Sequence, residues 1–131
     1  MATLSITPIY AAILGIMLVA LSMRVAAIVR GKGKVDSGDG GNPYFTTVIR
    51  GQGNFIEYVP LAVILIGFAE LGGTSGGWIH ALGGGLVVGR LLHPFGMTTK
   101  PGPNPFRFLG TILTWLTLLV ASILVLVNQL G

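Results

Sequence analysis

The stretch Arg50-Gly-Gln-Gly-Asn-Phe-Ile-Glu-Tyr-Val-Pro60 leads into an apolar run that carries no charge as far as residue 69. In a helix, Arg50, Asn54 and Glu57 stand at i, i+4 and i+7, so that they share one face with Tyr58 beside them. Ionisable groups at membrane depth are costly and normally face the interior of a bundle or a wet cavity. The stretch therefore predicts a functional site on a membrane helix.

A purely structural alternative exists for the same residues. Arg50 and Glu57 could pair with groups on other helices and only fix the packing. This alternative predicts no ligand at the polar face.

The composition is that of an integral membrane protein with a single domain over residues 1–131. Of these residues, 52% are hydrophobic and only 9% are charged, against roughly 25% charged residues in soluble domains. There are no cysteines, which excludes disulfides, a thiolate metal site and a thiol nucleophile from the protein itself. No metal site is predicted, and any sulfur chemistry must use a sulfur from the substrate.

The expected fold is an all-α bundle of four membrane-spanning helices over about 5–30, 43–71, 76–93 and 105–128. Three of the helices begin with a capping residue followed by proline, a typical start signal: Thr7-Pro8, Asn42-Pro43 and Asn104-Pro105. Pro94 should limit the third helix. Glu70, at the far boundary of the second helix, is expected to be a solvated end charge.

The basic residues predict the topology. All eight lie at the ends of the helices or in the connections between the first and second spans and between the third and fourth: Arg24, Arg30, Lys32, Lys34, Arg50, Arg90, Lys100 and Arg107. The positive-inside rule then places loops 31–43 and 94–104 in the cytoplasm and both termini outside. This pattern explains the net positive charge without nucleic acid, for which no recognisable binding motif is present.

Small residues recur at every fourth position of the third span, at Gly77, Ala81, Gly85 and Gly89. In lipid, such a stripe lets a neighbouring helix approach closely, so that van der Waals contacts hold the pair together. The stripe predicts close packing and not a binding site.

Arginines from different spans are expected at the same membrane face: Arg30, Arg50, Arg90 and Arg107. They would repel one another unless an anionic ligand, lipid headgroups or carboxylates compensated them, and arginine suits bidentate capture of carboxylates. Glu57 could receive an ammonium group. The complementary ligand is small and carries carboxylates and an amine, as glutathione does, although an anionic lipid headgroup meets part of this description.

The motif Arg50-x-Gln-x-Asn-x-x-Glu-Tyr-x-Pro60 resembles the second-helix signature of the MAPEG superfamily, the membrane-associated proteins in eicosanoid and glutathione metabolism. Gly38-Asp-Gly-Gly-Asn-Pro43 and Arg90-Leu-Leu-His93 resemble the bacterial members of that superfamily. The resemblance covers almost the whole chain, including its length, its spans and the positions of its loops.

This resemblance implies a homotrimer that binds glutathione between subunits near the cytoplasmic face. It implies binding roles for Arg30, Arg50, Gln52, Asn54, Glu57, Tyr58, Arg90 and His93. It also implies that Arg107 is the catalytic residue, which stabilises the glutathione thiolate while an apolar, lipid-like second substrate enters from the surrounding membrane lipids.

The implied activity is that of a glutathione transferase, with peroxidase activity as a second use of the thiolate, in the inner membrane if the source is bacterial. Met97 stands where several glutathione-using relatives carry a tyrosine, so that one hydroxyl contact is missing. One alternative is a non-catalytic lipid-binding or scaffold protein of the same fold. A proton-coupled exporter that uses Glu57 is another, although such exporters generally carry the coupling carboxylate in their first span.

Overall fold

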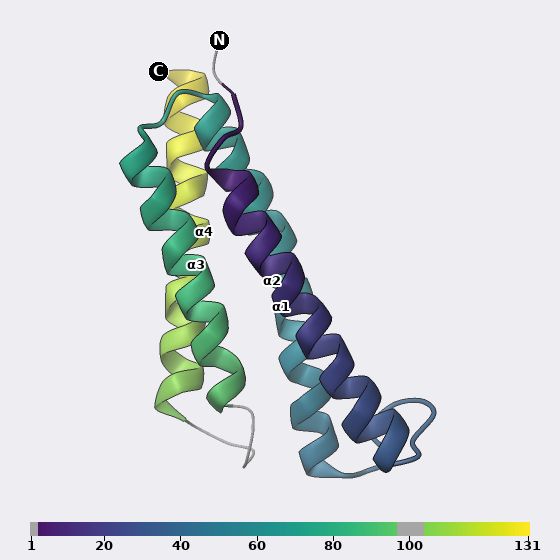
Figure 1. Ribbon diagram of the computed structural model, residues 1–131. Helices are drawn as coiled ribbons and strands as arrows, with labels where there is room; N and C mark the ends of the chain where they lie inside the picture. Colours follow the sequence, from purple (N-terminus) through teal and green to yellow (C-terminus); the bar gives the residue numbers. More distant parts are fainter. Residues whose placement is uncertain (1–2, 97–103) are drawn as a thin grey trace.

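The computed structural model describes residues 3–96 and 104–131, and in these residues the chain is helical without strands. The helices are α1 (Thr7–Val25), which continues as the π-helical segment η1 (Ala26–Lys32), followed by α2 (Pro43–Leu71), α3 (Gly76–Gly96) and α4 (Pro105–Leu130) (Figure 1). The predicted all-α architecture is confirmed.

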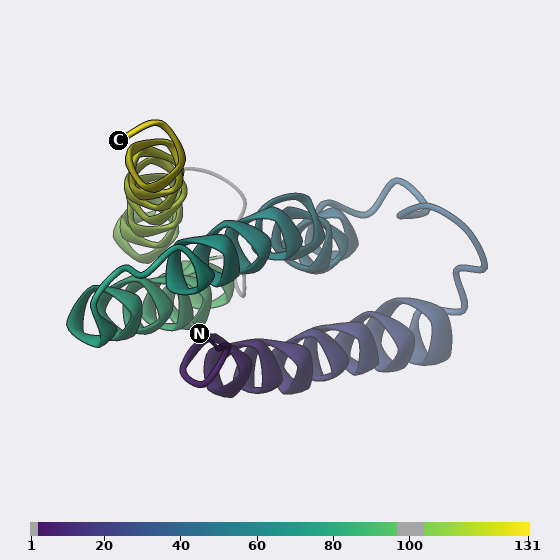
Figure 2. The ribbon, with the colours of Figure 1, turned by 90° about the horizontal axis from the view of Figure 1, so that it is seen from above.

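Two pairs of helices make up the bundle. α1 packs on α2 and α3 packs on α4, while α2 also contacts α3 and α4. Within the described residues α1 does not contact α4, and Figure 2 shows these two helices on opposite sides of the molecule. Both termini lie at one end and the loop between η1 and α2 lies at the other, where the two pairs diverge (Figure 1).

Three helices are long and apolar enough to cross a membrane: Thr7–Lys32, Pro43–Leu71 and Pro105–Leu130. α3, which carries Arg90 and His93, is not among these helices, and it packs along α4. Pro94 does not end α3, which continues to Gly96. Proline removes a hydrogen bond only to the preceding turn, so a helix can run on for a few residues after it.

Asparagine side chains begin α2 and α4 as the sequence predicts. Asn42 Oδ1 accepts a hydrogen bond from the backbone N–H of Tyr44 at 2.9 Å, and Asn104 Oδ1 accepts one from that of Phe106 at 2.9 Å. Each satisfies an N–H that has no partner within its own helix.

The predictions for the start of α1 and for Glu70 are wrong. Ile6 occupies the N-cap position of α1 and no side chain of α1 caps it. Glu70, which is only 7% exposed, reaches across from α2 instead. Its Oε2 accepts hydrogen bonds from the backbone N–H groups of Ser5 at 3.3 Å and Ile6 at 2.8 Å, and its Oε1 from that of Thr7 at 2.9 Å. A carboxylate from another helix is therefore the cap, and it complements the positive end of the α1 dipole.

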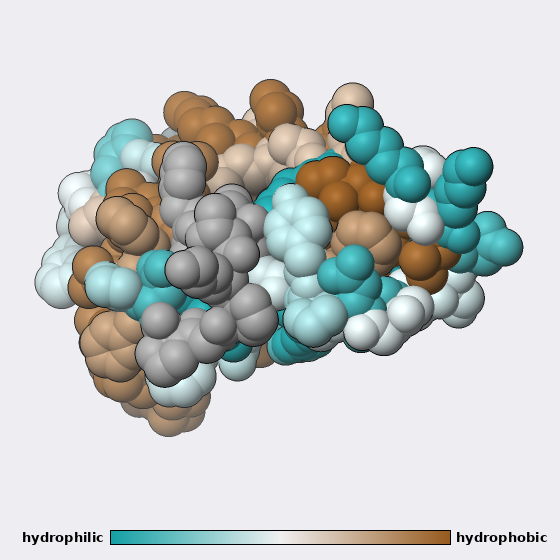
Figure 3. All heavy atoms as spheres, turned by 90° about the horizontal axis from the view of Figure 1, so that it is seen from below, coloured by the Kyte–Doolittle hydropathy of each residue, from teal (hydrophilic) through white to brown (hydrophobic). Residues whose placement is uncertain are grey.

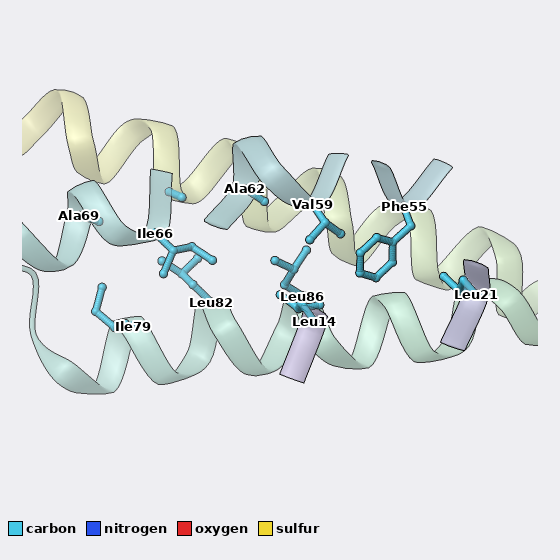
Figure 4. Packing of buried hydrophobic residues seen from close by; sticks show 11 residues of the cluster. Leu14, Leu21, Phe55, Val59, Ala62, Ile66, Ala69, Ile79, Leu82 and Leu86 are labelled. Carbon is cyan, nitrogen blue, oxygen red and sulfur yellow. The ribbon is translucent and has the colours of Figure 1, made fainter. Parts of the chain in front are cut away.

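The largest apolar cluster fills the space between the helices over much of their length. Figure 4 shows Phe55, Val59 and Ile66 of α2 facing Leu82 and Leu86 of α3, all of them buried. A second cluster of valines, Val25, Val29 and Val48, joins the end of α1 and η1 to α2. At the end of the bundle that carries the loop between η1 and α2, the apolar side chains of α2 and α3 give way to polar ones.

α3 and α4 cross closely where two glycines meet. A Cβ atom on Gly110 would lie 2.6 Å from the carbonyl oxygen of Gly89 and 2.8 Å from the backbone nitrogen of His93. Gly85 and Gly89 of the predicted stripe face α4 at this crossing, near Thr117 and Thr114. Close approach by small residues, as expected for membrane helices, is therefore confirmed for this part of the stripe.

We expect Gly110→Ala to lower the free energy of unfolding by about 2–3 kcal/mol, because overpacking against backbone atoms cannot be relieved by rotating a side chain. Thermal unfolding in detergent measures this loss. Gly15→Ala is the matched control, since a Cβ on Gly15 would meet nothing within 4 Å. It should leave stability unchanged or raise it by up to about 1 kcal/mol through helix propensity. Equal losses in the two variants would contradict the packing explanation.

Candidate functional site

The polar face of α2 carries an ion pair within the helix. Arg50 Nη1 lies 3.0 Å from Glu57 Oε1, and the two side chains are 52% and 49% exposed. The prediction that Arg50 and Glu57 share one face is confirmed, and within the described residues of one chain they pair with each other and not with a group on another helix. Both groups remain accessible to a ligand.

Arg50 and Arg107 also line one polar pocket, which we call the arginine pocket. It has a volume of about 340 Å³ and is lined by Asp39, Gly41, Pro43, Thr46, Thr47, Arg50 and Arg107. The start of α2 contributes Arg50 and the first turn of α4 contributes Arg107. The structure thus brings together two arginines that are 57 positions apart in the printed numbering.

Sequence reasoning missed Asp39, Thr46 and Thr47 as residues of this pocket. Hydrogen bonds from the Thr46 hydroxyl and from the backbone N–H of Gly41 lower the pKa of Asp39 below its ordinary value. Asp39 is therefore ionised at neutral pH and supplies the one carboxylate among the residues that line the pocket. The only feature of the sequence that could have drawn attention to Asp39 is its position just before Asn42, the N-cap of α2.

A second group of polar side chains, which we call the buried polar cluster, comprises the buried Arg90 and His93 of α3 and the half-buried Asn54 of α2, whose Oδ1 atom is buried. Arg90 is 0% exposed and His93 is 2% exposed. Arg90 Nη1 donates a hydrogen bond to Thr114 Oγ1 at 3.3 Å, and the guanidinium carbon lies 5.6 Å from the centre of the Phe55 ring. These contacts fix the direction of the side chain without neutralising its charge.

Several polar atoms of this cluster have no hydrogen-bond partner among the described residues. They are Asn54 Oδ1, Arg90 Nε, Arg90 Nη2 and His93 Nδ1. Buried polar groups in native proteins are nearly always hydrogen-bonded, and each exception needs an explanation. A missing partner costs about 1–3 kcal/mol for a neutral group and more for a charged one. This cluster is therefore not arranged for stability alone.

The two groups of residues are adjacent. Arg50, Arg90 and Arg107 are all near enough to His93 to interact with it electrostatically, and Tyr58 is similarly near Arg90. The predicted convergence of arginines on one face therefore holds for these three. The only ion pair to a carboxylate within residues 3–96 and 104–131 is the one between Arg50 and Glu57.

Arg30 and Gln52 are used differently. Arg30, in η1, donates hydrogen bonds to the carbonyl oxygens of Val35 at 3.0 Å and Gly38 at 2.6 Å, so it holds the loop that leads to α2. Gln52 donates to the hydroxyl of Ser22 at 2.8 Å and ties α2 to α1. Neither residue lines the arginine pocket, so a contact of either with a ligand remains a prediction.

Viewed from the loop end, the molecule shows hydrophilic residues gathered most densely on the side of the α1–α2 connection (Figure 3). Apolar side chains lie mainly along the top and at the opposite, left-hand side of this view. Met97, Lys100 and most of the predicted loop 94–104 lie outside the described residues. A polar site at one end of an apolar bundle is the arrangement expected at a membrane boundary.

Comparison with known proteins gives the family. The profile described as "MAPEG family" matches residues 7–127. The chain belongs to the MAPEG family. It is 32% identical to the inner membrane protein YecN of Escherichia coli K12 over 115 aligned residues. The alignment covers 88% of this chain and 86% of YecN. The YecN protein of Escherichia coli O6:H1 matches to the same extent. The matched range includes every residue of the candidate site in this MAPEG protein, which is an integral membrane protein.

Proposed function

We propose that this MAPEG protein is a membrane-bound glutathione transferase that adds the glutathione thiolate to apolar electrophiles, with peroxidase activity as a second use of the same thiolate. The site would bind glutathione as co-substrate, without a metal. The second substrate would be an apolar or lipid-like molecule that arrives through the bilayer.

The observation that carries this proposal is the set of unpartnered buried atoms on Asn54, Arg90 and His93. Two N–H groups of Arg90 require acceptors, and a ligand carboxylate supplies two oxygens in the geometry of a guanidinium. Asn54 Oδ1 accepts a hydrogen bond from an N–H group, such as those of peptide bonds. A small peptide with carboxylates supplies both kinds of partner.

The chemistry would then depend on Arg107. A cation beside a thiol favours the thiolate and lowers the thiol pKa, so that the proton leaves to solvent near neutral pH. The thiolate attacks the electrophilic carbon, an S–C bond forms, and the leaving group departs with its electron pair. Arg107 is exposed and lines the arginine pocket, where it could make this contact without rearrangement of the helices.

A homotrimer with sites between subunits would fit the exposed charges on α2. Arg50 and Glu57 are about half exposed on a helix long enough to cross the bilayer, and lipid is a poor environment for them. A neighbouring copy could cover this face. With loops 31–43 and 94–104 in the cytoplasm and the termini outside, the site would open to cytoplasmic glutathione, in the inner membrane as the name of YecN indicates for that relative.

Arg90→Met separates a structural role from a binding role. Methionine keeps the length of the side chain but removes an uncompensated buried charge, so we expect the unfolding free energy of the ligand-free protein to rise by about 1–2 kcal/mol. Glutathione binding, measured by calorimetry in detergent, should weaken roughly 10- to 100-fold.

Arg24→Ala is the control for a change of charge, because Arg24 lies on α1 and does not line the arginine pocket. It should leave binding unchanged. If Arg90→Met instead destabilised the protein and bound glutathione as the wild type does, Arg90 would be a structural residue and the proposal would lose its main support.

A non-catalytic lipid-binding protein is the second candidate, and one observation favours it. An apolar groove of about 550 Å³ lies between α1 and α2, lined by Leu4, Thr7, Pro8, Ala11, Val63, Ile64, Gly67, Phe68 and Leu71. It lies at the end that carries the termini, opposite the arginine pocket. Retention of phospholipid without consumption of thiol in the presence of electrophiles would favour this candidate. The exporter has less support, because Glu57 is already paired with Arg50.

A further inference from the structure

The arginine pocket contains a carboxylate that does not pair with its arginines. Asp39 lines this pocket together with Arg50 and Arg107, yet within the described residues it makes no ion pair with either of them. A carboxylate that shares a pocket with two guanidiniums is expected to pair with one, because the hydrogen bonds between these groups are strong and their geometries match. The separation of Asp39 from both arginines therefore requires a reason.

Other hydrogen bonds hold the Asp39 carboxylate in place. It accepts one from the hydroxyl of Thr46, in the first turn of α2, and one from the backbone N–H of Gly41 at 2.8 Å. Because both bonds stabilise the charged form, the pKa of Asp39 is lowered and the group stays ionised at neutral pH. To reach Arg107, the carboxylate would have to give up these bonds.

The loop that carries Asp39 is itself fixed. Arg30 of η1 donates hydrogen bonds to the carbonyl oxygens of Val35 at 3.0 Å and of Gly38, the residue just before Asp39, at 2.6 Å. Gly40 has a φ of +60°, and a Cβ atom there would lie 3.0 Å from a methyl group of Val35. Val35 in turn packs against the valine cluster that joins η1 to α2. The charge of Asp39 therefore has a defined position at the pocket.

This fixed charge changes which molecules the pocket attracts. Arg50 and Arg107 alone would attract any small anion. Because the proposed reaction needs Arg107 beside the thiolate, an electrophile with its own carboxylate would compete for that guanidinium. Asp39 offsets part of the positive charge and repels such a carboxylate, whereas it has little effect on a neutral electrophile.

We propose that Asp39 is a specificity-determining residue: its fixed negative charge disfavours anionic electrophiles at the arginine pocket, so that Arg107 stays available to the thiolate and neutral electrophiles are selected. This inference rests on the proposed function. It gives the loop between η1 and α2 a part in the choice of the second substrate.

Two electrophiles that differ in charge test the assignment on the full-length protein in detergent. 4-Chloro-3,5-dinitrobenzamide is neutral and 4-chloro-3,5-dinitrobenzoate is an anion; with both, the thiolate attacks the carbon that bears chlorine, an S–C bond forms and chloride leaves with the electron pair. The preference is the ratio of kcat/KM for the amide to kcat/KM for the benzoate, at one concentration of glutathione. Asp39→Asn removes the charge and keeps a side-chain oxygen as acceptor, so the preference should fall about three- to tenfold, as expected for like charges at a partly exposed site.

Asp36→Asn is the matched control, because Asp36 is an exposed acid of the same loop that does not line the pocket. It should keep the preference within about twofold of the wild type, since solvent screens a more distant charge. Asp39→Ser also removes the charge and should give the same shift as Asp39→Asn, so it serves if Asp39→Asn does not fold. The difference between either Asp39 variant and the wild type should shrink at about 1 M salt, where the Debye length is about 3 Å.

An unchanged preference in the Asp39 variants, or an equal shift in Asp36→Asn, would overturn the role of Asp39 and leave the proposed function intact. A shift that persisted undiminished at high salt would also overturn it, because a changed loop structure and not a lost charge would then set the preference. If the wild type consumed no glutathione above the uncatalysed rate with either electrophile, the proposed function would fail together with this inference.

Discussion

Replacement of Glu70 by alanine should lower the free energy of unfolding by about 3–5 kcal/mol, because a buried polar network loses its common acceptor. The carboxylate receives hydrogen bonds from the backbone N–H groups of Ser5, Ile6 and Thr7 and from the Ser5 hydroxyl. Without it, the first turn of α1 lacks acceptors where the membrane supplies few. Thermal or denaturant-induced unfolding in detergent measures the loss.

Glu70→Gln keeps one acceptor oxygen and removes the charge, so its loss should be smaller, about 1–3 kcal/mol. Asp36→Ala is the control for removal of an acid, since Asp36 is exposed in the loop before α2. It should change stability by less than about 0.5 kcal/mol. If Glu70→Ala were as mild as Asp36→Ala, Glu70 would not be the cap of α1.

If the protein is the glutathione transferase proposed above, Arg107→Ala should remove most of that activity while leaving the fold intact. Loss of one preorganised charge at a reacting atom typically lowers kcat by about 100- to 1000-fold. The pH at which the bound thiol ionises should rise by about 1–3 pH units, because the cation that favours the thiolate is gone. Ultraviolet absorbance of the thiolate, followed across pH, measures this midpoint. Arg107 is exposed on the first turn of α4, so stability should change little.

Arg107→Lys keeps a positive charge and should retain part of the activity, with a midpoint between those of the wild type and Arg107→Ala. Unchanged thiolate absorbance in Arg107→Ala would show that another group stabilises the sulfur. Normal ionisation of the thiol together with weaker glutathione binding would make Arg107 a binding residue and not a catalytic one.

Much of the fold could be predicted because membrane helices leave local signals. The positions of α2 and α4 could be predicted from long apolar runs that begin with Asn-Pro pairs. Both asparagine caps are confirmed. Glu70 was misjudged because its partners lie 63 to 65 residues away in the chain. A pattern read along one helix cannot show that its end lies against the start of another.

The candidate site could be predicted in part for the same reason. The face shared by Arg50 and Glu57 follows from helical spacing alone, and the structure confirms it. The burial of Arg90 depends on the crossing of α3 and α4 at Gly89 and Gly110, which brings the backbones too close together for solvent. Asp39 and Thr46 enter the arginine pocket through the fold of a loop that has no periodic pattern.

Titration of the purified wild-type protein with glutathione, with thiolate absorbance recorded on the same samples across pH, tests the central claim most directly. We expect saturable binding and a thiol that ionises well below its pKa in free solution. The absence of binding would contradict the account and favour the lipid-binding protein. Binding with a thiol that ionises as it does in water would contradict the role assigned to Arg107.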